Sequence, residues 1–265
     1  MERTLLVIST LCFLFGLAYT LHALRSRVYR HSLLNLCAIF TGFCLQTAFL
    51  YLRGQQVGRC PLTNRFELLI FLSWSMVLLY LIIGPPYRLT LLGAFTSPLV
   101  FLFQASALLI PGIDLPRSFI GAPNAWLELH AAVSVVAYGA FALAGVAGVM
   151  YLAQERQLKT HQIHSFFYHL PPIQALAEAN GRLLWTGFGL LTVGLVAGFA
   201  IGSFQTHLVK IVWSVGVWLL YGTILVAGLR HRVSGRRIAW LSVVAFSVAL
   251  LTLSGLTFIA EKARL

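Results

Sequence analysis

The residues best suited to ligand chemistry stand at the start of one apolar stretch, "WLELHAAVSVVAYGAF" at 126–141. His130 follows Trp126 by four residues, which puts both side chains on one face of a helix, and Ser134 and Tyr138 continue that face. An imidazole nitrogen can bind haem iron as an axial ligand. The same pair is also typical of an aromatic belt at a membrane surface, where the histidine reaches toward water. From position alone, both interpretations stay open.

A second histidine is available to complete such a site. His207 lies in a short polar link, "GSFQTHLVK". If this link lies near His130, two imidazoles can coordinate one haem iron from its two faces. His22 and His231 each end an apolar stretch at the opposite side, and they fit contacts with lipid headgroups better than iron ligation.

Two acidic residues also stand near the ends of apolar stretches. Glu128 is two residues from His130, so it points away from it, and we expect it to pair with a loop arginine. Glu67 follows Thr63 and Asn64, either of which is suited to cap a helix that begins there. An acid in the first turn matches the positive end of the helix dipole, so Glu67 has a capping interpretation as well as a functional one.

The composition says which kind of element must position these residues. Of the 265 residues 59% are hydrophobic and only 10% are charged, which is too apolar for a soluble domain of this size. Several apolar stretches run for about 20 residues, enough to cross a bilayer. We therefore predict an all-α, polytopic integral membrane protein that forms a single membrane domain over residues 1–265. The predicted spans are 4–24, 33–53, 65–83, 88–110, 125–152, 182–202, 209–230 and 236–260.

The basic residues set the expected orientation and partners. The net charge of +12 sits in short loops, so it predicts contact with membrane lipid and no binding of nucleic acid. Of the 19 Lys and Arg, eleven lie at one set of span ends, including the cluster "LRHRVSGRR" at 229–237, and eight lie at the other. The positive-inside rule then puts both termini outside, with His130 and His207 at the outer face.

Two further features concern how the spans connect and pack. The segment 153–181 is the only long polar connection, and we expect it in the cytoplasm, with its second half forming a short amphipathic helix on the membrane surface. Gly194, Gly198 and Gly202 recur every four residues, a pattern that predicts a close helix–helix seam. No nucleotide-binding loop, zinc-protease motif or nucleophile elbow is present, so no independent catalysis is expected.

Four stretches together resemble the CcsA/ResC-type cytochrome c assembly family, including its HemX-like branch. They are "PLTNRFELLIFLSWS" at 61–75, the stretch headed by His130 and closing in "YLAQERQLK", "FFYHLPPIQALAEANGRLLWTGFGLLTVGLVAGF" at 166–199, and "KIVWSVGVWLLYG" at 210–222. The resemblance covers about residues 60–250, in matching order and spacing.

The resemblance implies a role in handling haem. Members of this family present haem at the outer face of a bacterial inner membrane for attachment to apocytochrome c, together with a CcsB/ResB-type partner. The position of His130 corresponds to a histidine taken as a haem ligand, here haem b. Trp126, Trp213 and Trp218 would then line the outer cavity, with His207 as the second ligand.

This sequence also departs from the family pattern. The region "IGSFQTHLVK" lacks the tryptophan-rich motif, and "GLTFIAEK" replaces a segment that carries the second outer histidine. The HemX-like branch shares such losses. The alternative function is therefore a regulatory or assembly protein of haem biosynthesis that contacts a soluble haem-pathway enzyme and transfers no haem.

Overall fold

The structure is a computed structural model, and it describes residues 2–25, 33–84, 90–112, 114, 124–160, 172–201, 208–230 and 234–262. Over these residues the chain forms eight α-helices and no strand. Six of the helices are long and apolar enough to cross a membrane. The prediction of an all-α, multi-pass membrane protein is therefore confirmed.

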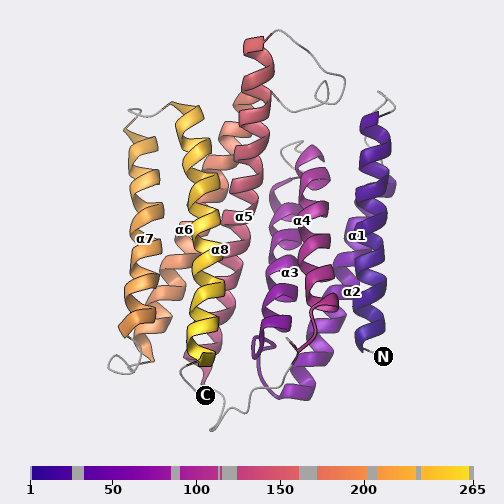
Figure 1. The fold of residues 1–265 in the computed structure, drawn as a ribbon, viewed down its shortest axis with the longest axis vertical. Coiled ribbons are helices and arrows are strands. Elements are labelled where there is room, and N and C mark those ends of the chain that lie inside the picture. Colours follow the sequence, from indigo (N-terminus) through magenta and orange to yellow (C-terminus); the bar gives the residue numbers. More distant parts are fainter. Residues whose placement is uncertain are drawn as a thin grey trace. The chain divides into compact units, whose positions relative to one another are not determined.

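The chain divides into two compact units. Unit 1 comprises Met1–Gly121 and Ala153–Ala175, and unit 2 comprises Ala122–Leu152 and Leu176–Leu265. Each unit contains four long helices, drawn in Figure 1. Whether the two units form one membrane domain, as the composition suggests, stays a prediction.

Unit 1 is built from four neighbouring helices. They are α1 (Glu2–Arg25), α2 (Leu33–Val57), α3 (Arg65–Ile83) and α4 (Thr90–Leu109), with α1 packed on α2 and α4, and α3 packed on α4 and α2. Polar side chains tie them together inside. Thr10 Oγ1 donates to Gln104 Oε1 at 2.9 Å, and Gln46 Nε2 donates to Ser73 Oγ at 2.6 Å. In a lipid environment buried polar groups must find their hydrogen-bond partners within the protein. These bonds hold the helices in register.

Unit 2 is organised around α5. It contains α5 (Ala125–Thr160) as far as Leu152, α6 (Ile173–Ala200) from Leu176 onward, α7 (Leu208–Leu229) and α8 (Gly235–Lys262). In the most apolar segment of α5 67% of the residues are buried, against 22% in that of α7, so α5 is the more buried of the two helices. Glycines allow the neighbouring helices to approach α5 closely. A Cβ on Gly187 of α6 would lie 2.5 Å from the Phe141 ring of α5, and a Cβ on Gly148 of α5 would lie 2.8 Å from the Ala239 carbonyl of α8.

A buried amide joins three of these helices. Asn180 of α6 is 3% exposed and donates from Nδ2 to the Ala144 carbonyl of α5 at 2.7 Å. Its Oδ1 accepts from Ser242 Oγ of α8 at 3.1 Å. A buried polar group whose donors and acceptors are used fixes the mutual register of α5, α6 and α8.

Helix boundaries differ from the predicted spans around the polar connection. Helix α5 continues to Thr160, eight residues beyond its predicted end, since this region is rich in helix formers and Lys159 Nζ pairs with Glu155 Oε1 at 2.7 Å. The expected surface helix is wrong: its residues are the first turns of α6, which begins at Ile173 and runs unbroken to Ala200. Leu176 and Asn180 are buried there, so packing extends the helix beyond the apolar span.

Candidate functional site

The start of α5 is set by Asn124. Its side-chain Oδ1 accepts a hydrogen bond from the Trp126 backbone N–H at 3.0 Å, and its carbonyl accepts from the Glu128 N–H at 3.0 Å. An asparagine in this position satisfies backbone donors that the first turn leaves free. This cap fixes where α5 begins, and therefore the position along the helix axis of His130 in its second turn. Trp126 is 52% exposed on this first turn.

His130 contacts the backbone of the neighbouring helix α6. Its Nδ1 lies 2.6 Å from the carbonyl oxygen of Gly194. A carbonyl only accepts hydrogen bonds, so Nδ1 is the donor and carries the proton. In the neutral imidazole, Nε2 is then unprotonated and has its lone pair available.

Glycines on α6 provide the space for this contact. A Cβ on Gly194 would lie 2.6 Å from Ser134 Oγ, and a Cβ on Gly198 would lie 2.8 Å from His130 Nδ1. The glycine seam predicted from four-residue spacing is therefore confirmed at these two positions, and its partner is the His130–Ser134 face of α5. Gly202 lies outside the described residues.

This arrangement has the properties of a ligand held for metal binding. Histidines that bind metals usually donate their other ring N–H to a carbonyl or carboxylate, which fixes the tautomer and the ring orientation. His130 meets this condition through Gly194, and it is only partly buried. The described residues contain no group of three or more His, Cys, Asp or Glu able to hold a metal ion by themselves. A single available imidazole suits haem, whose iron needs only axial ligands from the protein.

The other proposed site residues are less constrained. His207 lies outside the described residues. Trp213 is 46% exposed on α7. Trp218 donates from Nε1 to Thr192 Oγ1 at 2.9 Å and stacks on Phe188, with ring centroids 5.2 Å apart. Because Thr192 and Gly194 point to different faces of α6, Trp218 contacts a different face from His130. The assignment of the tryptophans to a common cavity stays a prediction.

Glu128 is half-buried near the same helix start. Its Oε1 is buried and has no hydrogen-bond partner among the described residues. The expected ion pair with a loop arginine is therefore not observed in this part of the chain.

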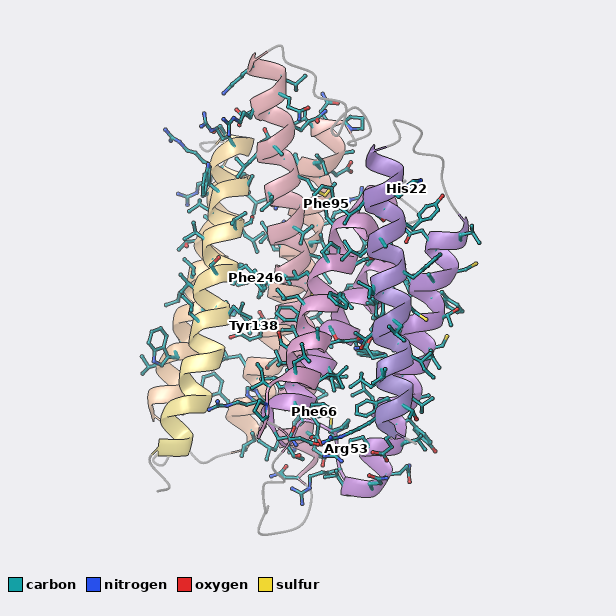
Figure 2. All side chains as sticks on the ribbon, turned by 45° about the vertical axis from the view of Figure 1, so that its right-hand side comes forward. His22, Arg53, Phe66, Phe95, Tyr138 and Phe246 are labelled. Atoms are coloured by element: carbon teal, nitrogen blue, oxygen red, sulfur yellow. The ribbon has the colours of Figure 1, made fainter. Side chains whose placement is uncertain are left out.

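A second polar cluster closes one end of unit 1, where Figure 2 shows Arg53, with His22 near the other end. Glu67 is fully buried and accepts from Arg53 Nε at 2.8 Å. Its other oxygen accepts from both the backbone N–H and the hydroxyl of Thr63 at 2.7 Å. Asn64 Oδ1 caps α3 by accepting from the Glu67 N–H at 2.8 Å. The capping interpretation is confirmed, and because both carboxylate oxygens are engaged the geometry favours a structural role for Glu67.

Asp114 completes this cluster. One of its oxygens accepts from Arg53 at 3.0 Å and the other from Arg3 at 2.5 Å. The ion network therefore joins the start of α1, the end of α2, the start of α3 and the segment after α4. Asp114 was not among the residues predicted from the sequence. The available signal was a single acid in a loop that shares its membrane side with several arginines.

The group that orients His130 was not predicted from the sequence either. The Gly194 carbonyl is a backbone atom, so no residue type marks it, and only the glycine spacing indicated a close approach at this point.

Comparisons with known proteins identify the family of the chain. The model of the family described as "Cytochrome C assembly protein" matches residues 62–262. The chain is 26% identical over 239 residues to the cytochrome c biogenesis protein CcsA of Guillardia theta, covering 81% of this chain and 79% of that protein. It is 24% identical over 239 residues to CcsA of Trieres chinensis, covering 77% of each chain. An uncharacterized 28.8 kDa protein of Azospirillum brasilense is 32% identical over 181 residues, covering 66% of this chain and 62% of that protein.

Proposed function

Because this chain belongs to the cytochrome C assembly protein family, we propose that it is an integral membrane component of cytochrome c biogenesis that binds haem through His130. The observation that carries the haem assignment is the 2.6 Å contact between His130 Nδ1 and the Gly194 carbonyl. This contact leaves Nε2 as a preoriented ligand at the start of a membrane-spanning helix.

The residues around His130 have distinct tasks in this proposal. Gly194 holds the imidazole ring through its carbonyl, and Gly198 leaves the space that the ring occupies. Asn124 fixes the start of α5, so the imidazole is presented at a defined height. Haem, when bound, would be held by Nε2 of His130, and it would supply the prosthetic group that cytochrome c biogenesis attaches. His207 is the proposed second ligand, and Trp126, Trp213 and Trp218 are the proposed aromatic lining.

The finer assignments belong to the same proposal. The cofactor is haem b, and the membrane is the bacterial inner membrane with both termini outside. The partners are a CcsB/ResB-type membrane protein and apocytochrome c. The chain handles haem for attachment and carries out no independent catalysis.

An absorption spectrum tests the haem assignment. The full-length chain, purified in detergent from cells supplied with haem, should show a Soret band, and His130→Ala should lose most of it. His22→Ala is the matched control, because His22 is an exposed histidine in unit 1 and lies outside the proposed site. An unchanged spectrum in His130→Ala, or no Soret band after haem feeding, would refute haem binding through His130.

A second candidate function follows from the sequence of the link 201–210. It lacks the tryptophan-rich motif of haem-transferring relatives, which favours a HemX-like regulator of haem biosynthesis. The two functions differ in the phenotype of a deletion strain. Loss of holocytochrome c with normal total haem supports assembly, whereas altered total haem with proportionate cytochrome c supports regulation through a haem-pathway enzyme.

A further inference from the structure

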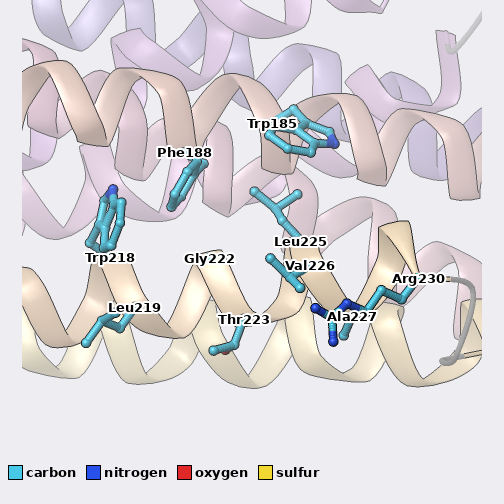
Figure 3. Close-up of a pocket in the computed structure, with 10 residues that line it drawn as sticks. All are labelled: Trp185, Phe188, Trp218, Leu219, Gly222, Thr223, Leu225, Val226, Ala227 and Arg230. Atoms are coloured by element: carbon cyan, nitrogen blue, oxygen red, sulfur yellow. The ribbon is translucent and has the colours of Figure 1, made fainter.

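An open groove runs along α7 on the side that faces α6. It has a volume of about 630 Å³, within the usual range for small-molecule sites. Trp185 and Phe188 of α6 form one wall, and α7 from Trp218 to Arg230 forms the other. Figure 3 shows the stacked pair Phe188 and Trp218 toward one end of the groove and Arg230 at the other.

The groove exists because side chains are small along its floor and fixed at one end. Gly222 lies opposite Phe188, and a Cβ there would be 3.4 Å from the Phe188 ring, so the glycine leaves space next to an aromatic wall. The hydrogen bond from Trp218 to Thr192 holds the indole, and the stack of Trp218 on Phe188 closes this end. The groove is therefore left open while Trp218 and Phe188, which close its end, already have their own partners.

The polarity of the groove changes along its length. Its walls are aliphatic and aromatic, and the only charged lining residue is Arg230, directly after the last residue of α7. Arg230 has no carboxylate partner among the described residues. Arg236 and Arg237 begin α8 close by in sequence, and both are exposed. An acid on α6 at the corresponding end, Glu178, is already paired with Arg182.

Haem does not fit this lining. The residues around the groove include no His, Cys, Met or Tyr, so a haem iron would have no axial ligand there. An amphiphile with an apolar body and an anionic head matches the lining instead. Basic pockets between membrane helices recognise anionic lipid headgroups in this way.

We propose that the groove binds one anionic phospholipid, with an acyl chain along Trp185 and Gly222 and the phosphate on Arg230. The charge complementarity supports a lipid drawn from the leaflet in which α7 ends. Arg236 and Arg237 lie on the same side and reinforce the positive potential there. This inference concerns unit 2 alone and does not depend on haem binding at His130.

Native mass spectrometry of the full-length chain in detergent tests the proposal. Phosphatidylglycerol and phosphatidylcholine with identical acyl chains are titrated onto delipidated protein, and we expect preferential retention of one phosphatidylglycerol. Arg230→Gln should weaken phosphatidylglycerol binding by about fivefold, the effect of about one lost headgroup charge contact, and leave phosphatidylcholine unchanged. Arg182→Gln is the matched control, because Arg182 lies at the same end of unit 2 but already pairs with Glu178.

A second variant tests the apolar part of the groove. Ala227 lines the groove, and Ala227→Trp should fill it and weaken the binding of both lipids. Circular dichroism and gel filtration establish that each variant is folded.

Four results would overturn the proposal. They are equal retention of the two lipids, an equal loss in Arg182→Gln and Arg230→Gln, one-for-one displacement of the lipid by haem, and a chain dimer whose formation excludes the lipid. The third would identify a porphyrin site and the fourth an interface between copies of the chain.

Discussion

Replacing Gly198 by alanine isolates the hydrogen bond that orients His130, because the new methyl group presses on the imidazole ring while the histidine itself is kept. The added Cβ would lie 2.8 Å from His130 Nδ1 and 3.0 Å from Cε1. Carbon and nitrogen atoms in ordinary contact are about 3.5 Å apart, so the ring must move by roughly 0.7 Å.

This displacement is large compared with the hydrogen bond that it affects. The contact from Nδ1 to the Gly194 carbonyl is 2.6 Å, and a shift of that size away from the carbonyl would take it beyond the roughly 3.2 Å limit of a good N–H···O bond. Loss of an outer-sphere partner of a metal-binding histidine typically lowers metal affinity by about 10- to 100-fold. We therefore expect Gly198→Ala to weaken haem binding within that range while His130 is still present.

Titration of haem-free protein in detergent, followed by the Soret band, measures this effect. Gly189→Ala is the matched control, because Gly189 lies on the same helix and a Cβ there meets nothing within 4 Å. Its haem affinity should stay within about twofold of the unchanged protein. Thermal stability would not distinguish Gly198→Ala from the unchanged protein. Alanine stabilises the helix by up to about 1 kcal/mol relative to glycine, and the lost hydrogen bond costs about as much.

Two results would refute this reasoning. If Gly198→Ala binds haem as tightly as the unchanged chain while His130→Ala does not, the Gly194 carbonyl does not orient the ligand. If Gly189→Ala loses as much affinity as Gly198→Ala, the effect belongs to α6 in general.

The remaining predictions concern stability in detergent, measured as the thermal unfolding midpoint of the haem-free chain. Glu67→Gln removes the fully buried carboxylate of a partly buried ion pair and should cost about 2 kcal/mol, because the partly exposed Arg53 keeps its second partner Asp114. Glu178→Gln at an exposed pair should cost under about 1 kcal/mol, and equal losses would contradict the structural role of Glu67. Asn180→Ala removes the buried amide that joins three helices and should cost about 2 kcal/mol of stability. Ser247→Ala should cost almost nothing, because the Ser247 hydroxyl donates to a carbonyl of its own helix. Similar unfolding midpoints for the two variants would contradict a role of Asn180 in fixing the register of the helices. Tyr221→Phe removes a buried hydroxyl that has no hydrogen-bond partner within the described part of the chain. Stability should therefore be unchanged or raised by up to about 1 kcal/mol, and a clear loss would reveal a bound partner.

Local sequence patterns were sufficient for several features of the fold. The eight apolar stretches correspond to eight helices, because apolar length is what a bilayer requires of a span. Asn64 was one of two expected caps for α3, and it accepts the Glu67 N–H as such a residue does. The glycine spacing on α6 indicated a close seam, and the side chains of His130 and Ser134 occupy it.

Helix ends and polar partners could not be obtained in this way. Hydropathy measures how favourably a residue transfers from water into lipid. It therefore does not predict the polar helical turns that extend α5 and α6 beyond their apolar spans. The ion network at Asp114 depends on residues up to 111 positions apart, as in its contact with Arg3, and their meeting depends on how four helices pack.

The amino-acid sequence by itself determined that the chain is an all-helical membrane protein and that a histidine and a glycine seam lie on adjacent spans. It could do so because apolar length, helical spacing and residue type are local properties. Only the tertiary structure decided that the seam belongs to His130, that its Nδ1 donates to a backbone carbonyl, and that α7 leaves a groove ending at Arg230. Each of these depends on which helices are neighbours and how they are rotated, and packing between distant segments sets both.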